Sequence, residues 1–453
     1  MSDIENLKLP EPLNVNKNIL NILDNLEKKG ETIMIFAGAL VIETIFQLYL
    51  IKKYKSKCVI YAENKSYGHK RPIGITVGLK MKFTKDESNQ MKEHFTQLSK
   101  ILTECIKKGE KTIIIPLTYE IGKAGGHSNV LIYRKNTNEL EHFEPHGGEY
   151  IGNEKIQNAA KKIMLLFTNI LNLGLKRENL PEVKYIEASQ VCPYIRGLQT
   201  LETNSKLKKN KEEPMGYCAA WSMFFTELCF KNPELSSNQV LDNIYNYLTT
   251  KPYAEDYLKK VIRGYTGFLV EKVNKYLEIF FKPKITVVDI INYYHDPSKI
   301  YKIIKLNDVI KILVELESKI LLETDFNLEK ELKETTKLYK NLTKNMTKEE
   351  EAKNRINNKK IQDLYYKKRI LQNYEEYNKN EKITEPILDS FLEIKRETMI
   401  NPRILEKKQL YEERDIQKKE VKKIKKSLKT QKKSPKTKTK KLKPTVIEES
   451  FQI

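Results

Sequence analysis

The sequence predicts an α+β protein that continues into a helical extension and a basic tail. Up to about residue 283, short apolar runs typical of strands alternate with helical patterns, and beyond it only helical patterns occur. A chain of 453 residues can bury a sizeable core without disulfides or metals. We expect a flexible leader at 1–18, an α+β domain at 19–283, a helical domain at 284–400 and a lysine-rich tail at 401–453.

Within the α+β domain, the apolar patterns place most elements. Residues 19–53 have the spacing of two helices that break near Gly30. The expected strands are 58–63, 72–80, 111–119, 128–135, 139–144 and 183–187, and the further helices are 87–108, 154–173 and 217–231. Asn136, Thr137 and Asn138 separate two of these strands and predict a β-hairpin.

Residues 32–51 form an apolar stretch of twenty residues, long enough to suggest a membrane span. Glu43 lies in its middle and Gln47 one helical turn later, and a carboxylate at the bilayer centre costs about 2.5–3.5 kcal/mol. We therefore interpret 32–51 as a buried core helix and keep a membrane anchor as the alternative.

The cysteines and the N-terminus bear on the cellular compartment. Five cysteines are too few and too scattered for a disulfide framework, and no C-x-x-C pair indicates a zinc or redox site. No basic region followed by an apolar one marks a secretory signal at the N-terminus. We expect an intracellular protein in a reducing compartment.

Six residues of the helical domain follow one another at spacings of three and four, as in a short heptad seam. They are Leu328, Leu332, Thr335, Tyr339, Leu342 and Met346. We favour packing between neighbouring helices of the same chain over a dimerising coiled coil, and the sequence leaves the oligomeric state open.

Much of the positive charge lies in one segment near the C-terminus. The chain has a net charge of +22, and residues 416–444 contain 14 lysines and a single acid, Glu420, which leaves about +9 for the rest. This segment has nothing to bury, so we expect it to be disordered. Its lysines favour nonspecific binding to nucleic acid through counterion release, and a solvated or targeting tail is the alternative.

Two glycine-punctuated segments, GGHSN and FEPHGG, border the predicted hairpin. A turn centred on 135–136 sets His127 opposite Glu144, with Cβ atoms about 4.5–5.5 Å apart. A turn centred on Thr137 instead sets His127 opposite Gly147. A carboxylate beside a histidine fixes the ring tautomer and stabilises the imidazolium, as a general base requires. His127 and Glu144 are therefore candidates for a base and its orienting acid.

A third segment, PMGYCAAWS, supplies a nucleophile. Pro214 and Gly216 precede Cys218 at the first turn of a predicted apolar helix, and helix N-termini favour the thiolate form of cysteine. Upstream of this helix, Gln199 offers a side-chain amide as a donor to an oxyanion.

The order of these four residues resembles that of the adenovirus protease (adenain) and the SUMO/ubiquitin-like protease clan of cysteine proteases. The string NVLIYRKNTNELEHFEPHG is similar to the adenain hairpin, whose second strand also ends in Phe-Glu-Pro-x-Gly. The resemblance covers roughly residues 110–235, and similar proteins occur in large DNA viruses. It implies an adenain-type, papain-like fold with His127 as base, Glu144 as orienting acid, Gln199 as oxyanion donor and Cys218 as nucleophile.

Two features depart from the family pattern. Ser128 follows the histidine where the family usually has an aromatic residue, and a basic insertion at 204–211 separates the glutamine from the cysteine. Gln190 is a weaker candidate for the oxyanion donor, and His146 is the rival base. His142 and His146 have the spacing of a zinc pair, but no paired cysteines accompany them, so we expect no metal and no cofactor.

The sequence thus indicates a thiol protease that cleaves peptide or isopeptide bonds after small, glycine-type residues. The resemblance implies a protein substrate, either a viral precursor polyprotein or a ubiquitin-like conjugate. Such an enzyme would act in the host cytoplasm or nucleus, or be packaged in the virion. The competing hypothesis is a catalytically inactive, protease-like structural protein of the virion whose basic tail binds nucleic acid.

Overall fold

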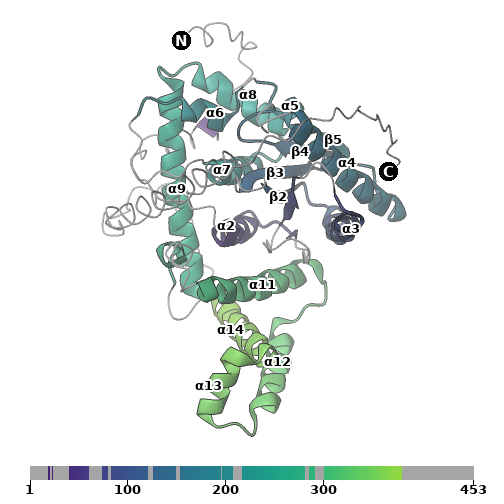
Figure 1. Ribbon diagram of the computed structural model, residues 1–453, viewed down its shortest axis with the longest axis vertical. Helices are drawn as coiled ribbons and strands as arrows, with labels where there is room; N and C mark the ends of the chain where they lie inside the picture. Colours follow the sequence, from purple (N-terminus) through teal and green to yellow (C-terminus); the bar gives the residue numbers. More distant parts are fainter. Residues whose placement is uncertain are drawn as a thin grey trace, which may run out of the picture. The chain divides into compact units, whose positions relative to one another are not determined.

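A computed structural model (Figure 1) describes residues 19–20, 23, 40–60, 74–79, 83–120, 126–148, 154–194, 196–207, 217–280, 285–290 and 300–379. The chain divides into two compact units, 1–394 and 395–453, and all described residues belong to the first. The expected leader at 1–18 and the expected tail at 401–453, with its basic segment 416–444, lie outside the described residues.

A mixed five-stranded sheet is the centre of the described part of the chain. Its strands are β1 (Ile75–Gly78), β2 (Thr112–Glu120), β3 (Gly126–Arg134), β4 (Glu139–Phe143) and β5 (Lys184–Ile186). They lie side by side in chain order; β1 is parallel to β2 and β4 to β5, and β3 is antiparallel to both its neighbours. This combination of a mixed sheet with many helices agrees with the expected α+β class. Residues 58–60, expected to begin a strand, have no strand structure.

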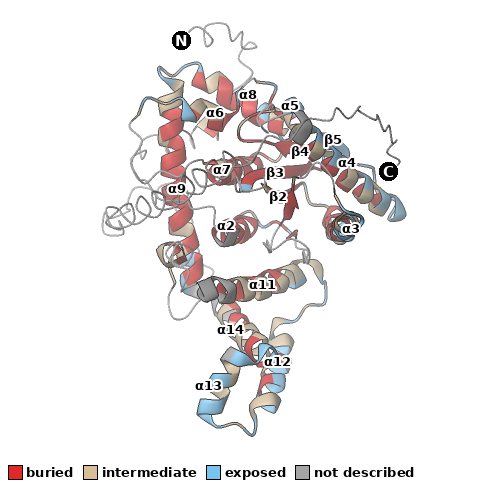
Figure 2. Cartoon of the chain, in the orientation of Figure 1, coloured by how far each residue is buried: buried red, intermediate tan, exposed pale blue. Residues whose placement is uncertain are grey.

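Helices cover both faces of this sheet (Figure 1). They are α2 (Leu40–Lys53), α3 (Lys85–Lys107), α4 (Glu154–Arg177), α5 (Ala188–Val191), α6 (Leu198–Thr203), α7 (Cys218–Lys231), α8 (Ser237–Leu248) and α9 (Ala254–Phe280). Helices α3 and α4 pack on the face that carries Leu131 and Tyr133, and α2, α7, α8 and α9 pack on the face that carries Val130 and Ile132. Successive residues of β3 thus point to opposite faces, and both faces are buried (Figure 2).

Helix α7 lies in the core, which explains why its sequence is apolar around its whole circumference. Residues 219–229 are all buried, and the helix packs against β3 and against α2, α8 and α9. Ser222 Oγ donates to the backbone oxygen of Ser128 at 3.1 Å. Because Ser222 lies about one turn into the helix, this bond ties the first turn of α7 to β3.

Helix α2 contains the described part of the apolar stretch 32–51. Glu43, Thr44 and Gln47 are buried, and Glu43 accepts a hydrogen bond from Ser128 Oγ at 2.6 Å. Gln47 Nε2 lies 2.9 Å from Met223 Sδ of α7. None of the helices within the described ranges is long and apolar enough to cross a membrane. The residues of 32–51 that are described therefore make the contacts of a core helix.

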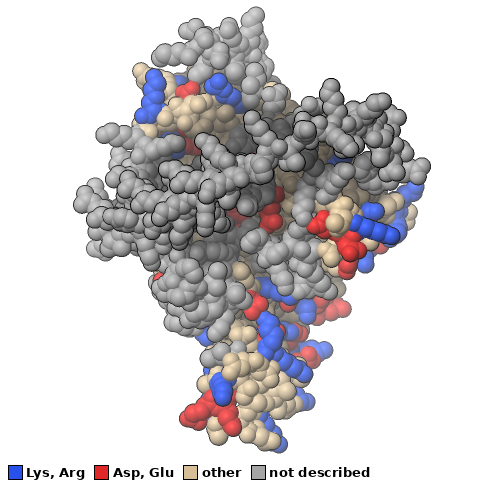
Figure 3. All heavy atoms as spheres, in the orientation of Figure 1, with Lys and Arg blue, Asp and Glu red and all other residues tan. Residues whose placement is uncertain are grey.

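The described residues from 300 onward form four helices. They are α11 (Ile300–Leu322), α12 (Leu328–Thr343), α13 (Lys348–Asn357) and α14 (Lys359–Lys379). Helix α12 packs against α14 of the same chain, with Thr335 and Tyr339 of the seam buried. Met346, the last residue of the seam, lies beyond the end of α12. On the face drawn in Figure 3, both Lys/Arg and Asp/Glu side chains lie over these helices. The charged side chains on this face of the helices are therefore of both signs.

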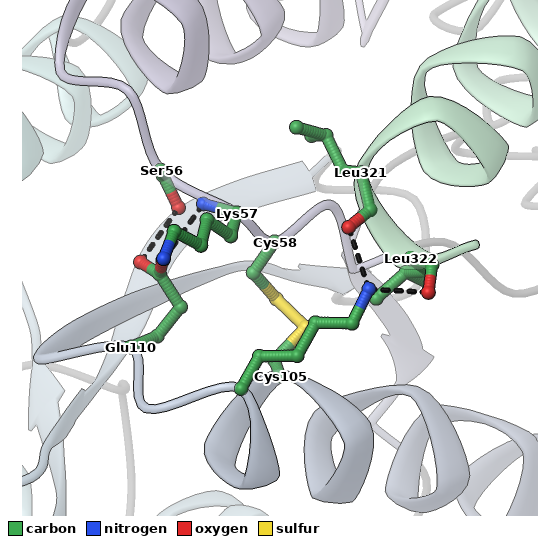
Figure 4. Close-up of a disulfide and its surroundings, with 8 residues drawn as sticks. Ser56, Lys57, Cys58, Cys105, Glu110, Leu321 and Leu322 are labelled. Carbon is green, nitrogen blue, oxygen red and sulfur yellow. Dashed lines mark hydrogen bonds between the residues drawn. A yellow bond between two sulfur atoms is a disulfide. The ribbon is translucent and has the colours of Figure 1, made fainter. Parts of the chain in front are cut away.

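Cys58 and Cys105 form a disulfide between the segment after α2 and the last turn of α3 (Figure 4). The Glu110 carboxylate supports the same region, because it accepts from Ser56 Oγ at 3.2 Å and from the N–H of Lys57 at 2.9 Å. The scattered cysteines of the sequence did not predict this disulfide. Cys58 and Cys105 lie 47 positions apart in the sequence and meet only through tertiary packing. The other cysteines are free, namely Cys192, Cys218 and Cys229.

Candidate active site

The β3–β4 hairpin brings His127 and Glu144 to the same end of the sheet. Its ladder ends at the pair Val130 and Phe143, so paired residue numbers sum to 273. Both turn centres considered from the sequence are therefore wrong. The physical reason lies in the turn: it spans four residues and ends at Asn138, whose φ of +51° is in the left-handed region that asparagine tolerates.

His127 and Glu144 are nevertheless in contact. His127 Nε2 lies 2.6 Å from Glu144 Oε1, and both residues are buried. Glu144 follows the last residue of β4, so its side chain is not committed to the ladder and can turn toward the start of β3. The same oxygen accepts the backbone N–H of His146 at 3.0 Å, which helps to fix the orientation of the carboxylate.

Cys218 is the first residue of α7 and carries a free, partly exposed thiol. This thiol hydrogen-bonds with the imidazole of His127. Because Nε2 of the ring is taken by Glu144, Nδ1 is the ring nitrogen that remains for the sulfur. The bond from Ser222 to β3 anchors the first turn of α7 and so keeps the thiol beside the histidine.

Opposing effects set the charge of His127. Burial lowers the pKa of the imidazole, but the negative charge of Glu144 and the interactions with Cys218 outweigh burial and raise the pKa to about 10. The imidazolium is therefore the resting form at neutral pH.

A second imidazole lies beside the first, because the rings of His127 and His146 have centroids 5.2 Å apart. Burial and the positive charge of His127 lower the pKa of His146 to about 3, so this ring stays neutral. Thr200 Oγ1 donates to the backbone oxygen of His146 at 2.9 Å and lies 3.3 Å from Nδ1 of the same residue. Since the hydroxyl hydrogen is already used, the hydroxyl accepts from Nδ1–H. His146, the alternative candidate for the base, therefore lies close to the site, but the imidazole that contacts the Glu144 carboxylate is that of His127.

Two further sequence candidates have other contacts. His142 Nδ1 lies 2.9 Å from Tyr185 OH, and its Nε2 lies 3.2 Å from Asn129 Oδ1. Burial is the main cause that lowers the pKa of His142 to about 3. Gln190 Oε1 accepts the backbone N–H of Glu187 and caps α5. In the part of the chain that the structure describes, no three His, Cys, Asp or Glu side chains are grouped so as to hold a metal ion.

Gln199 is joined to the site through backbone contacts. It is the second residue of α6, and its N–H donates to the backbone oxygen of Pro145 at 2.9 Å. The N–H of Gly197 donates to the backbone oxygen of His146 at 2.8 Å. The two segments approach so closely that a Cβ on Gly197 would lie 2.2 Å from the backbone nitrogen of Gly147. Gln199 is buried, and its Oε1 has no hydrogen-bond partner among the described residues.

Sequence reasoning missed the residues that hold the site in place. Ser128, the departure from the family pattern, joins β3 to α2 through Glu43 and to α7 through Ser222. Thr200 joins α6 to the loop after β4. These residues meet only in tertiary packing, so no spacing rule predicts them. The glycines of FEPHGG and of the Arg-Gly-Leu-Gln segment were the available signal.

The candidate residues form one connected arrangement. Glu144, His127 and Cys218 are linked by hydrogen bonds, and Gln199 lies on the segment that pairs with the loop after β4. A partly exposed thiol, a proton carrier and a buried carboxylate that orients it are the components that nucleophilic catalysis requires.

No protein-family model matches the chain. The chain is similar to a protein of Acanthamoeba polyphaga mimivirus that carries the name ankyrin repeat protein L371, with 22% identity over 310 residues, 63% of this chain and 39% of that protein. The chain thus spans about two-fifths of the length of this viral relative.

Two solved structures are similar at a lower level. The Chlamydia trachomatis effector protein ChlaDUB1 matches with a TM-score of 0.31 and 10% identity over 58% of this chain and 94% of its own. The Legionella pneumophila effector protein RavZ matches with a TM-score of 0.26 and 11% identity over 70% of this chain and 89% of its own. TM-scores of this size assign no fold.

Proposed function

We propose that this chain is a cysteine protease in which Cys218 attacks a peptide or isopeptide carbonyl. The observation that carries the proposal is the linked set of Glu144, His127 and Cys218, with 2.6 Å between the carboxylate and the imidazole and the thiol at the start of a buried helix. Burying a carboxylate and an imidazolium costs free energy. A carboxylate on one side of the ring and a thiol on the other supports a catalytic role over a packing role.

In the proposed reaction, Cys218 reacts as the thiolate and His127 as the imidazolium. The Cys218 thiolate attacks the carbonyl carbon, and the imidazolium of His127 gives its proton to the departing amine, which leaves a thioester. The neutral imidazole then takes a proton from a water molecule, the hydroxide attacks the thioester, and the carboxylic acid leaves as the thiolate reforms. Glu144 holds the ring and stabilises the imidazolium in both halves of the reaction.

Two donors are proposed for the oxyanion that forms on the carbonyl oxygen. The first N–H groups of a helix have no partner within it, so the backbone N–H of Cys218 is suited to this role. The side-chain amide of Gln199 is the second. The docking of its segment on Pro145 and His146, beside Glu144, supports this assignment over one to Gln190, which caps α5.

The resemblance of the hairpin to that of adenain supports a papain-like fold and a small residue, such as glycine, before the scissile bond. A protein substrate follows, either a viral precursor or a ubiquitin-like conjugate. The mimivirus relative supports a viral setting.

A thiol-reactive electrophile tests the proposal. It is attached to the C-terminal Gly-Gly of a ubiquitin-like protein in one probe and to a short peptide ending in Gly-Gly in the other. We expect an adduct on Cys218 and none on Cys192 or Cys229, which are buried. Labelling by the protein probe alone favours a conjugate as substrate, whereas equal labelling by both favours a precursor cleaved at a peptide motif.

His127→Ala is the control, because it removes the base and leaves the thiol. We expect it to abolish labelling while Cys192→Ala labels normally. An adduct on another cysteine, or labelling of His127→Ala at the wild-type rate, would exclude the proposed site. A folded wild-type chain that neither probe labels would favour the inactive structural protein instead.

A further inference from the structure

Lys259 and Glu202 form an ion pair in the interior, between α9 and α6. Only 5% of Lys259 and 1% of Glu202 is exposed to solvent. A lysine and a glutamate are rarely buried to this extent unless they are paired, because each loses the hydration of its charge. The pair therefore holds α6 at one place on α9.

The same ammonium group also contacts the start of α7. Lys259 Nζ lies 4.8 Å from the centre of the Tyr217 ring, which is a cation–π distance. Tyr217 is buried and directly precedes Cys218 in the chain. One side chain thus touches the helix that carries Gln199 and the residue before the candidate nucleophile.

A second contact attaches the segment that follows α6 to the same helix, near the end of α6 that carries Glu202. Asp256, about one turn before Lys259 on α9, accepts from Ser205 Oγ at 2.6 Å and from the backbone N–H of Lys206 at 2.9 Å. The segment after α6 is therefore attached to the first turns of α9. This contact is partly exposed, whereas the pair of Lys259 with Glu202 is buried beside Tyr217.

From this geometry we propose that Lys259 is a positioning residue that fixes the distance between the two oxyanion donors, the Gln199 amide and the backbone N–H of Cys218. The inference rests on the proposed protease function and extends it to a residue far along the chain. Through Glu202 the ammonium holds the helix of the first donor, and through Tyr217 it holds the residue next to the second. Lys259 itself does not touch the substrate.

Two reagents separate the oxyanion site from the nucleophile. Iodoacetamide alkylates a thiolate by displacing iodide, and no oxyanion forms. A peptide aldehyde ending in Gly-Gly adds the thiol across its carbonyl, so that a C–S bond forms, nothing leaves, and the carbonyl oxygen becomes the group that the two donors stabilise. Each variant is measured for its iodoacetamide rate at Cys218, its aldehyde inhibition constant and its Tm.

We expect Lys259→Met to weaken aldehyde binding about tenfold or more, while the iodoacetamide rate changes less than about twofold. Lys259→Arg keeps the charge and should retain most of the affinity. Because Lys259→Met removes the ammonium group from beside the buried carboxylate of Glu202, Tm will fall. The double variant Lys259→Met with Glu202→Leu removes both charges and should regain Tm but not aldehyde affinity.

Lys53→Met is the matched control, because it breaks another lysine–glutamate pair. Lys53 Nζ lies 2.8 Å from the carboxylate of Glu227, which is about two and a half turns beyond Cys218 on α7. This variant should leave aldehyde affinity unchanged. Wild-type affinity in the double variant, or an equal loss in Lys53→Met, would mean that the pair only stabilises the fold. A wild-type protein that binds no aldehyde would overturn the protease function itself, and the inference with it.

Discussion

Glu144 Oε1 lies 2.6 Å from His127 Nε2, although the β3–β4 ladder ends one residue before Glu144. The carboxylate is held by its own loop, because the same oxygen accepts the N–H of His146 at 3.0 Å. That loop is in turn fixed by the hydrogen bonds of the α6 segment to Pro145 and His146. Orientation and charge are therefore separable properties of Glu144, and a substitution that preserves shape can distinguish them.

Glu144→Gln should lower the pKa of His127 from about 10 toward its ordinary value, because the carboxylate is the strongest of the interactions that raise it. The amide keeps an oxygen for the ring, so some activity should remain, with kcat/KM reduced about 10²- to 10⁴-fold. NMR titration of the His127 ring and kinetics with a peptide substrate measure the two effects. Glu141→Gln, which alters a buried carboxylate paired with Arg134, is the control. An unchanged His127 pKa in Glu144→Gln would contradict the electrostatic role.

The ion pair of His127 should make stability depend on pH in the alkaline range. The pKa of His127 is about 10 in the folded chain and 6.5 in the unfolded chain. Its contribution is therefore complete below pH 6.5 and is lost as the pH rises through about 10. Relative to His127→Gln, the free energy of unfolding of the wild type should fall on the order of 1 kcal/mol per pH unit between these values. Parallel curves for the two proteins in urea titrations from pH 6 to 10 would refute the raised pKa.

His94 predicts the opposite behaviour in acid. It is buried in α3, neither ring nitrogen has a hydrogen-bond partner among the described residues, and burial lowers its pKa to about 4. The unfolded chain binds a proton at a higher pH than the folded chain, so stability present above pH 6.5 is lost as the pH falls through about 4. The stability of His94→Leu relative to the wild type should therefore rise on the order of 1 kcal/mol per pH unit as the pH falls from 6.5.

Urea unfolding at pH 7, 6 and 5 measures this gain. Lys92→Gln, at an exposed position on the same helix, is the control and should show no such trend. A His94→Leu variant whose stability relative to the wild type does not change with pH would show that His94 is not the titrating group.

The disulfide between Cys58 and Cys105 should stabilise the oxidised chain. It closes a loop of 47 positions, for which the chain-entropy relation gives about 4 kcal/mol. The double variant Cys58→Ala with Cys105→Ala should lose about this much free energy of unfolding relative to the oxidised wild type. Dithiothreitol breaks the disulfide, so it should lower the free energy of unfolding of the wild type to that of the variant. It should leave the free energy of unfolding of the variant unchanged. Equal free energies of unfolding of the wild type with and without reductant would show that the disulfide does not stabilise the chain. The reducing compartment expected from the sequence stays a prediction.

Local patterns predicted the elements around the site better than their pairing. The strand expected at 111–119 and the helix expected at 217–231 agree closely with β2 and α7, because their apolar patterns are long and buried on both sides. The hairpin register was not predictable, since a turn of Asn136, Thr137 and Asn138 permits several centres and a small shift changes every pair.

The contact of His127 with Glu144 was expected for the wrong reason. It was derived from direct opposition across two strands, but Glu144 reaches the ring from the loop that follows β4. That loop is shaped by glycines and by the approach of Gly197, a segment 50 positions away from Gly147 in the sequence. Contacts of this kind depend on tertiary packing, and so does the placement of Gln199.

The basic segment 416–444 lies outside the described residues, and its role stays a proposal from the sequence. Fourteen lysines and one acid should bind phosphate backbones nonspecifically through counterion release, so that affinity falls steeply with salt. The segment contains no aromatic residue and no arginine, which argues against stacking on single-stranded nucleic acid.

Deletion of 416–453 should therefore abolish salt-sensitive retention of double-stranded DNA and leave labelling of Cys218 unchanged, because none of the proposed catalytic residues lies in the deleted part. Retention on DNA at 50, 100 and 200 mM salt and labelling of the same samples test both statements. The matched control replaces eight of the fourteen lysines by glutamine, so that the length of the tail is kept while most of its charge is lost. A truncated protein that holds DNA as well as the full chain would place the binding surface in the body. Loss of labelling on deletion would instead mean that the tail takes part in catalysis.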